Sequence, residues 1–348
     1  METVWYVLLV LMLTAYACLD GFDLGAGALH LLIARNDDER RLILRCIGPV
    51  WDGNEVWLIA AGGTLYFAFP LLYASSLSGF YLSLHIVLWL LILRAVGIEF
   101  RAHLHLSIWR DFFDGVFSLS SIALIAFFGV AFGNVIRGVP LQADHFFFEP
   151  LWTNWIVSVN NGILDWYTVS CAVLAVIALA AHGASYVALK TEGDVQQRSH
   201  RAAMLAAGPL VLLTLASLVA TLKIRPEMLQ NYTRHPVAFI IPGAVLIGLA
   251  GIIYFSVRRH DWHRFLSSCL YIISMLLGAA IALYPSLLPA STGGAYALTI
   301  YNTKAGEYSL ASGLYWWGAG ITLAVAYFVL VYWMFRGKVR QHATDDEY

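Results

Sequence analysis

The chain has 348 residues, of which 60% are hydrophobic and only 12% are charged. Ordinary soluble domains carry about twice that charged share, so the composition indicates a membrane protein. The formal net charge of -1 predicts neither a nucleic-acid partner nor a strongly acidic one. Nearly every charge lies in a short gap between apolar runs, which excludes a separate soluble domain. We therefore expect one transmembrane helical domain over residues 1–348.

Nine apolar runs are long enough to cross a hydrocarbon core about 30 Å thick, and backbone groups in lipid must bond internally, so each predicts a helix. The runs lie near residues 4–24, 50–73, 77–99, 115–136, 163–188, 203–222, 236–257, 265–285 and 313–335. The first has neither the basic start nor the cleavage site of a signal peptide, so we expect it to be retained. A glycine-rich break at Gly25 and Gly27 is expected to separate it from a short segment at 28–34. The predicted fold is an all-α polytopic membrane protein.

Lys and Arg are distributed unevenly between the two sides of such a nine-helix arrangement. The connections after spans 1, 3, 5 and 7, together with the C-terminal segment, hold 16 of them, whereas the other side holds 5. The C-terminal segment contributes Arg336, Lys338 and Arg340. Because cytoplasmic loops carry the excess of basic residues, we expect the N-terminus outside and the C-terminus in the cytoplasm.

Six ionisable residues stand in or beside the first three spans, at their predicted cytoplasmic ends. They are Asp20, Asp23, Asp52, Glu55, Arg94 and Glu99. Such groups are costly at membrane depth unless they face a partner charge, the bundle interior or a water-filled cavity, so they form the candidate site. Two pairs of these acids have i, i+3 spacing and would share a helix face. Five crowded acids beside one Arg cannot all ionise cheaply, so we expect at least one to have a raised pKa, and a carboxyl group that titrates near neutral pH can carry protons.

A purely structural role could explain the same residues. Asp52 and Glu55 fit a variant of the capping box at the start of the second span. Asp20 and Asp23 could cap the short helix after the glycine break, and the Arg94 side chain could extend to the headgroups. The sequence alone leaves both interpretations open.

Histidine and cysteine positions bear on cofactors. A buried b-type heme needs axial His or Met ligands. The histidines in or beside spans, His30, His85 and His182, form no pair at helical spacing, so we expect hydrogen-bonded packing residues and no heme held by axial ligands from this chain. The cysteines are Cys18, Cys46, Cys171 and Cys269. They lack the close paired spacing of metal or disulfide frameworks, so we expect no metal site.

Three segments near the start of the chain are distinctive, namely LDGFDLG at 19–25, GPVWDGNEVWLI at 48–59 and RAVGIEFR at 94–101. They resemble the signature segments of subunit II of bd-type quinol oxidases. The stretch from Tyr284 to Leu310 resembles that family's loop before the last helix. The match departs at Ala95 and Glu99, where some relatives carry Pro and Asp.

This resemblance implies a bacterial inner-membrane complex that oxidises quinol and reduces oxygen to water with protons taken from the cytoplasm. It implies a partner, subunit I, which carries three hemes, two b-type and one d-type, together with the quinol-oxidation site. Subunit I would share this subunit's fold through a pseudo-two-fold relation. Membrane lipid and small single-helix accessory subunits are further expected partners, and some members hold a structural quinone in subunit II. The resemblance places Trp51 and Asp52 near the proton route at the subunit interface, with no catalytic residue in this chain.

Two other functions stay open on the sequence. Acids within spans and glycine-broken helices also occur at the binding sites of proton-coupled membrane carriers. The only internal echo, Asp-Gly-x-Asp at 20–23 and Asp-Gly-x-Glu at 52–55, is too short to be a repeat. Alternatively, the chain could be an inert scaffold that only stabilises the heme-bearing subunit.

Overall fold

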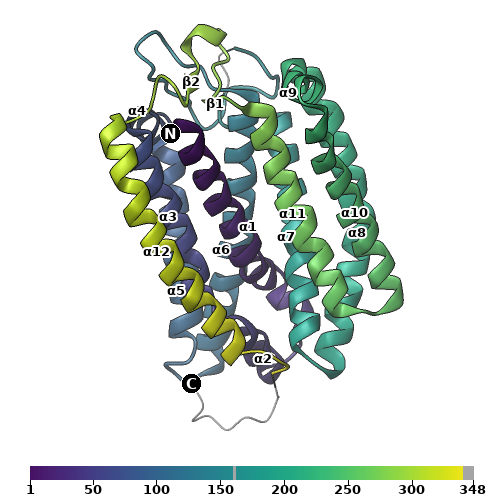
Figure 1. Ribbon diagram of the computed structural model, residues 1–348. Coiled ribbons are helices and arrows are strands. Elements are labelled where there is room, and N and C mark those ends of the chain that lie inside the picture. The colour runs from purple at the N-terminus through teal and green to yellow at the C-terminus, as the bar shows by residue number, and fades with distance from the viewer. Residues whose placement is uncertain (160–161, 340–348) are drawn as a thin grey trace.

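The structure is a computed structural model that describes residues 1–159 and 162–339, and it is a bundle of long helices (Figure 1). Arg340, counted above among the C-terminal basic residues, lies outside the described residues. The helices are α1 (Glu2–Ile33), α2 (Asp37–Ile47), α3 (Trp51–Ala68), α4 (Pro70–Gly79), α5 (Tyr81–Phe100), α6 (Ser107–Arg137), α7 (Trp166–Lys190), α8 (Gly193–Ile224), α9 (Gln230–Arg234), α10 (Ile240–Arg258), α11 (Asp261–Leu283) and α12 (Glu307–Met334). Single 3₁₀ turns lie at 226–229, 236–239 and 294–296, and β1 (Ser286–Leu288) pairs antiparallel with β2 (Leu298–Thr299).

The helix content confirms the predicted class of polytopic helical membrane protein. Within the described ranges, eight helices are long and apolar enough to cross a membrane, and α3 with α4 forms one further candidate, bent by 119°. The predicted straight run over 50–73 is therefore wrong at its C-terminal end. Pro70 starts α4 and cannot donate the backbone hydrogen bond that would continue α3, so the chain turns at Phe69.

Helix α6 begins about two turns, and helix α8 nearly three turns, before the predicted apolar runs. Arg110 lies on the first turn of α6, and Arg198 and Arg201 lie on α8. An apolar run marks only the part of a helix that contacts lipid. The backbone hydrogen bonds of the same helix continue beyond it into the headgroup region and water. Charged residues expected in loops are thus on helix ends.

Helix α1 runs unbroken through Gly25 and Gly27, so the predicted break is wrong. The two glycines instead allow neighbouring helices to touch α1. A Cβ atom on Gly25 would lie 1.9 Å from the carbonyl oxygen of Leu179 on α7, and one on Gly27 would lie 2.2 Å from Oγ of Ser121 on α6. Gly183 of α7 faces α1 in the same way, with 2.3 Å between its virtual Cβ and the Ala26 nitrogen. Helix α1 is consequently the central helix of the bundle (Figure 1).

We expect Gly25→Ala to destabilise the subunit by at least about 1–3 kcal/mol, because the new methyl group overlaps the α7 backbone and the helices must separate. Gly62→Ala on α3 is the matched control, since nothing lies within 4 Å of its virtual Cβ. Thermal unfolding of the purified complex measures the difference. Equal melting temperatures for the two variants would contradict the close α1–α7 contact.

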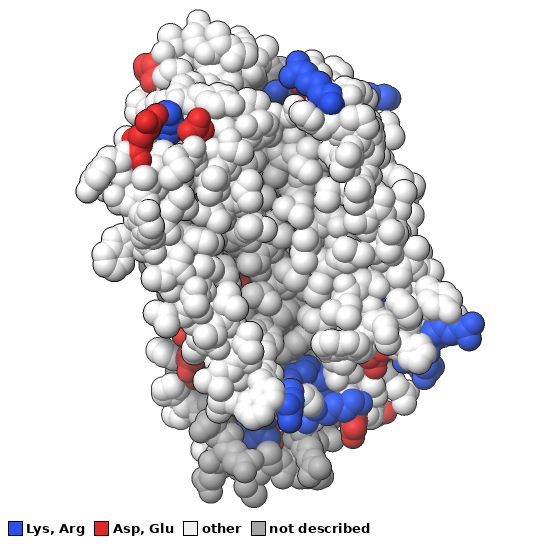
Figure 2. Space-filling view, viewed as in Figure 1, with Lys and Arg blue, Asp and Glu red and all other residues white. Residues whose placement is uncertain are grey.

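Charged side chains are concentrated at the two ends of the molecule, and the belt between them is almost free of them on the face shown in Figure 2. One end holds the start of α1, the β1–β2 hairpin and the connection between α6 and α7 (Figure 1). The other end holds α2, the end of α12 and a dense group of basic side chains (Figures 1 and 2). We call the second end the basic end.

Candidate functional site

A fully buried ion pair joins α5 to α1. The guanidinium of Arg94 donates two hydrogen bonds to the carboxylate of Asp20, at 2.8 Å from Nη1 and 2.5 Å from Nη2. Both side chains have 0% relative exposure. Glu55 of α3 lies further off, with 3.8 Å between its Oε2 and Nη1 of Arg94. The guanidinium also lies 5.9 Å from the ring centroid of Trp51. Such a bidentate pair holds both side chains in one geometry. Removing either partner would leave the other charge unpaired and away from water, which is strongly destabilising.

A second buried acid, Asp23, lies one turn further along α1. Its Oδ2 accepts a hydrogen bond of 2.7 Å from Nδ2 of Asn54 on α3, and the Asn54 side-chain oxygen accepts one of 2.9 Å from the hydroxyl of Tyr332 on α12. The other carboxyl oxygen, Oδ1, is buried and has no protein hydrogen-bond partner. A buried oxygen of this kind can hold a proton or accept a hydrogen bond from a water molecule.

The structure brings five of the predicted residues together and leaves two apart. Asp20, Asp23, Glu55, Arg94 and Trp51 meet between α1, α3 and α5, and we call these five residues with Asn54 the acid–arginine cluster. Asp52 and Glu99 are exposed in the isolated chain and make no side-chain contact with the pair of Asp20 and Arg94.

The structure does not bear out the helix caps, or the extension of Arg94 to the headgroups, that could have explained these residues. Asp20 and Asp23 lie in the interior of the continuous α1 and cannot cap a helix start. Val50 is the N-cap of α3 and makes no side-chain cap, so Asp52 and Glu55 close no capping box. Arg94 is fully buried and does not reach the headgroups. Asp52 does lie in the first turn of α3, where the helix dipole favours a negative charge.

Sequence reasoning missed Asn54 as a member of this cluster and Tyr332 as the hydrogen-bond donor to Asn54. Asn54 stands in the quoted segment at 48–59 but carries no charge to mark it. Tyr332 is 278 positions away in the chain and looks like any interfacial aromatic residue.

A neighbouring network, also missed, surrounds the buried Asp114 of α6. His30 of α1 lies 2.7 Å from Asp114, and Arg101 at the end of α5 donates to the same carboxylate at 2.6 Å. Arg101 also donates to Asp37 of α2 at 2.6 Å. The segment at 94–101 thus ties α5 to α1 through Arg94 and to α2 and α6 through Arg101, which holds the acid–arginine cluster at a fixed position.

The histidines within spans are hydrogen bonded, as predicted. His30 bonds Asp114, His85 bonds the backbone of its own helix at Tyr81, and His182 bonds Ser268 and the Cys18 carbonyl.

A separate charged group closes the connection between α6 and α7 at the end opposite the basic end. Arg137 donates to Glu149 at 2.7 Å and to Asp165, the N-cap of α7. Burial raises the pKa of Glu149 to about 7, and the nearby Asp165 raises it too, while Arg137 lowers it. Burial prevails because two carboxylates share one guanidinium and Oε2 of Glu149 has no hydrogen-bond partner.

This raised pKa predicts a pH-dependent stability. Folded Glu149 holds its proton up to about pH 7, whereas the unfolded chain loses it near its ordinary value of 4.5. Stability therefore falls as pH rises from about 5 to 7, by up to about 3 kcal/mol in all, and stays low above that. We expect Glu149→Gln to remove this slope in thermal melts, whereas Glu307→Gln, at an exposed acid, keeps it. An unchanged slope in Glu149→Gln would contradict this assignment.

Together these features define a polytopic helical membrane protein with a buried acid–arginine cluster near its basic end. A family model described as cytochrome bd terminal oxidase subunit II matches residues 1–335. The chain belongs to this family, which confirms the resemblance drawn from its motifs, and it is a subunit of a bd-type terminal oxidase.

Individual relatives agree with this assignment. The chain is 30% identical to the cytochrome bd-I ubiquinol oxidase subunit 2 of Escherichia coli K12, over 97% of this chain and 94% of that protein. It is 29% identical to the cytochrome bd ubiquinol oxidase subunit 2 of Bacillus subtilis, over 89% and 88%. The fold is similar to a chain in the structure of the bd oxidase from Geobacillus thermodenitrificans, with a TM-score of 0.74 and 18% identity over 96% of this chain and 98% of that chain.

Proposed function

We propose that this chain is the heme-free subunit of a quinol:oxygen oxidase and that it conducts protons from the cytoplasm toward a heme-bearing partner, subunit I. In this complex quinol is oxidised and oxygen is reduced to water. The observation that carries the proposal is a series of carboxyl groups with decreasing exposure. Asp52 is exposed at the start of α3, the Glu55 side chain is 21% exposed, and Asp23 is fully buried.

The members of the series have different tasks. Asp20 anchors the cluster, because both of its carboxylate oxygens accept hydrogen bonds from the buried guanidinium of Arg94. Glu55 and Asp23 are not held by two hydrogen bonds from a guanidinium, so we assign proton exchange to them, with Asp52 as the entry at the surface. Asn54, held by Tyr332, fixes the orientation of the Asp23 carboxyl group and leaves its Oδ1 free for a proton or water.

We further propose nine spans, with α3 and α4 counted as one, in a single domain of the bacterial inner membrane. The N-terminus is outside and the C-terminus cytoplasmic. The basic residues support this orientation, since those at the ends of α5, α7, α10 and α12 and on α2 lie at one end of the bundle.

The hemes, two b-type and one d-type, belong to subunit I in this proposal. In support, His30 and His182 are fully buried and already use ring nitrogens in protein hydrogen bonds. A heme iron bound there would have to replace these bonds.

Subunit I packs against exposed apolar helix faces of this chain. Helices α5 and α12 bury the least of their apolar window inside the chain, 11% and 0%. Lipid and small single-helix accessory subunits occupy further faces.

A structural quinone would fit an apolar cavity of about 460 Å³ between α1, α3 and α12, which is lined by Trp5, Trp57 and Trp316 among others.

The family assignment decides against the proton-coupled carrier that the sequence left open. Substitution of the acids distinguishes a proton-conducting subunit from an inert scaffold, because a scaffold would keep its turnover without them. We expect Asp52→Asn to slow oxygen consumption several-fold without dispersing the complex, because the exposed entry of the route loses its titrating group. Turnover with quinol is measured on complex purified through this chain, and the optical spectrum reports the hemes.

Glu99→Gln is the matched control for Asp52→Asn, since it removes an exposed acid that is outside the acid–arginine cluster. Its turnover should equal that of the wild type. Wild-type turnover in Asp52→Asn itself would remove Asp52 from the proton route. Absence of heme from the purified complex would overturn the oxidase assignment.

A further inference from the structure

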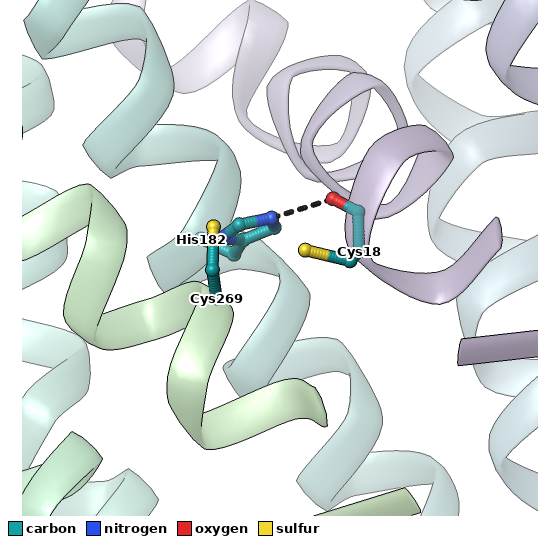
Figure 3. Close-up of side chains that lie close together, drawn as sticks. All are labelled: Cys18, His182 and Cys269. Atoms are coloured by element: carbon teal, nitrogen blue, oxygen red, sulfur yellow. Dashed lines mark hydrogen bonds between the residues drawn. The ribbon is translucent and has the colours of Figure 1, made fainter. Parts of the chain in front are cut away.

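Three potential metal ligands from three helices meet inside the bundle (Figure 3). Cys18 lies on α1, His182 on α7 and Cys269 on α11. One potential ligand atom of each lies within 4.8 Å of those of the other two. Figure 3 shows both sulfur atoms close to the imidazole ring. The cysteines are far apart in the sequence, which predicts no metal site. Only the fold brings the three side chains together.

The surroundings of these residues are apolar and mostly closed. Cys18 and His182 are buried and Cys269 is half-buried. The ring of Phe265 lies parallel to the imidazole, 5.1 Å between centroids and 8° between planes, and Phe22 approaches it edge-on at 6.0 Å. Aromatic walls of this kind exclude water, so an ion bound here would depend on the two sulfurs and the imidazole.

The hydrogen bonds of His182 fix its tautomer. The carbonyl oxygen of Cys18 can only accept, so Nε2, which lies 2.9 Å away, carries the proton of the neutral ring and donates to it. Nδ1 then accepts a hydrogen bond from the Ser268 hydroxyl at 2.7 Å. The same hydroxyl has a second acceptor, the carbonyl oxygen of Phe265 at 2.7 Å, so it can turn away and release the Nδ1 lone pair.

We propose that Cys18, His182 and Cys269 bind one copper(I) ion. A metal ion uses the Nδ1 lone pair when the Ser268 hydroxyl turns to the Phe265 carbonyl, while the hydrogen bond from Nε2 to the Cys18 carbonyl orients the ring, as second-shell partners of metal-bound histidines do. Sulfur ligands with imidazole select copper(I) or zinc. Zinc prefers four ligands in a tetrahedron, whereas this cluster offers three. Copper(I) binds one cysteine as the thiolate and releases that thiol's proton to the surrounding water, so the occupied site has no net charge, which suits a site inside the membrane.

Copper binding to the complete oxidase complex tests the proposal. Purified complex is titrated with copper(I) against a chromogenic copper(I) chelator, and bound copper is counted by elemental analysis. We expect about one tightly held copper per complex in the wild type, and affinity weakened at least about tenfold in Cys18→Ser and Cys269→Ser. Cys171→Ser is the matched control, because Cys171 is a buried cysteine on α7 outside the cluster. Its copper affinity should equal that of the wild type.

A second readout does not depend on the variants folding. Copper(I) bound to the wild-type complex should protect the half-buried Cys269 from a thiol-alkylating reagent, and X-ray absorption should find sulfur and nitrogen neighbours around copper. Equal copper affinity in wild type, Cys18→Ser and Cys269→Ser would overturn the proposal. Alkylation of Cys269 unaffected by copper, or retention of zinc in place of copper, would overturn it as well.

Discussion

Replacing Arg94 with glutamine is expected to destabilise the subunit by about 3–5 kcal/mol, because it leaves the carboxylate of Asp20 buried without its partner. The loss exceeds that of a surface ion pair, which contributes at most about 1 kcal/mol. Both members of this pair have 0% exposure, so water cannot replace the guanidinium. We expect a lower yield of assembled, heme-containing oxidase and a lower melting temperature of what remains.

A second substitution separates the lost pair from lost packing. The double variant Asp20→Asn with Arg94→Gln has no buried charge at these two positions, so it should recover much of the stability that Arg94→Gln loses. Arg258→Gln is the control, since Arg258 is exposed and lies over the ring of Tyr254. If Arg94→Gln and Arg258→Gln melted at the same temperature, the pair of Asp20 and Arg94 would not anchor α5 to α1.

The helical frame of this protein is predictable because a single physical requirement dominates it. Apolar runs must form helices in lipid, so hydropathy alone locates α5, α7, α10 and α11 to within about four residues at each end. The errors occur where local chemistry competes with hydropathy. Pro70 ends α3 although apolar residues continue beyond it. Gly25 and Gly27 suggest a broken helix, yet the tight contact with α7 and α6 keeps α1 continuous.

The candidate site was predictable in kind but not in arrangement. Charges within apolar runs identify Asp20, Asp23 and Arg94, because membrane depth makes each of them costly. The sequence cannot show which acid pairs with the arginine, since that depends on how α1, α3 and α5 pack. The family resemblance points to Trp51 and Asp52, whereas the contacts inside the bundle involve Asp20, Asp23 and Glu55. The cluster of Cys18, His182 and Cys269 was invisible for the same reason.

The burial of Asp23 changes which acid should matter most to turnover. We expect Asp23→Asn to lower quinol-driven oxygen consumption by at least about tenfold. This is a lower bound, because one positioned proton-transfer group usually contributes about 100-fold or more. Asparagine has nearly the same shape and can keep the contact with Asn54, so the hemes and the assembly should be unaffected. The amide cannot release and take up a proton at Oδ1, which is the step that the carboxyl group supplies.

Three comparisons make the Asp23 result specific to proton transfer. Asp23→Glu should retain more turnover than Asp23→Asn, because it restores a titrating group on the same turn of α1. Tyr332→Phe removes the hydroxyl that holds Asn54 at 2.9 Å and should have a smaller effect, since it loosens the orientation of the carboxyl group without removing it. Asp111→Asn, at a side chain 64% exposed, should be silent. Full turnover in Asp23→Asn with intact hemes would show that protons reach subunit I without passing through the Asp23 carboxyl group.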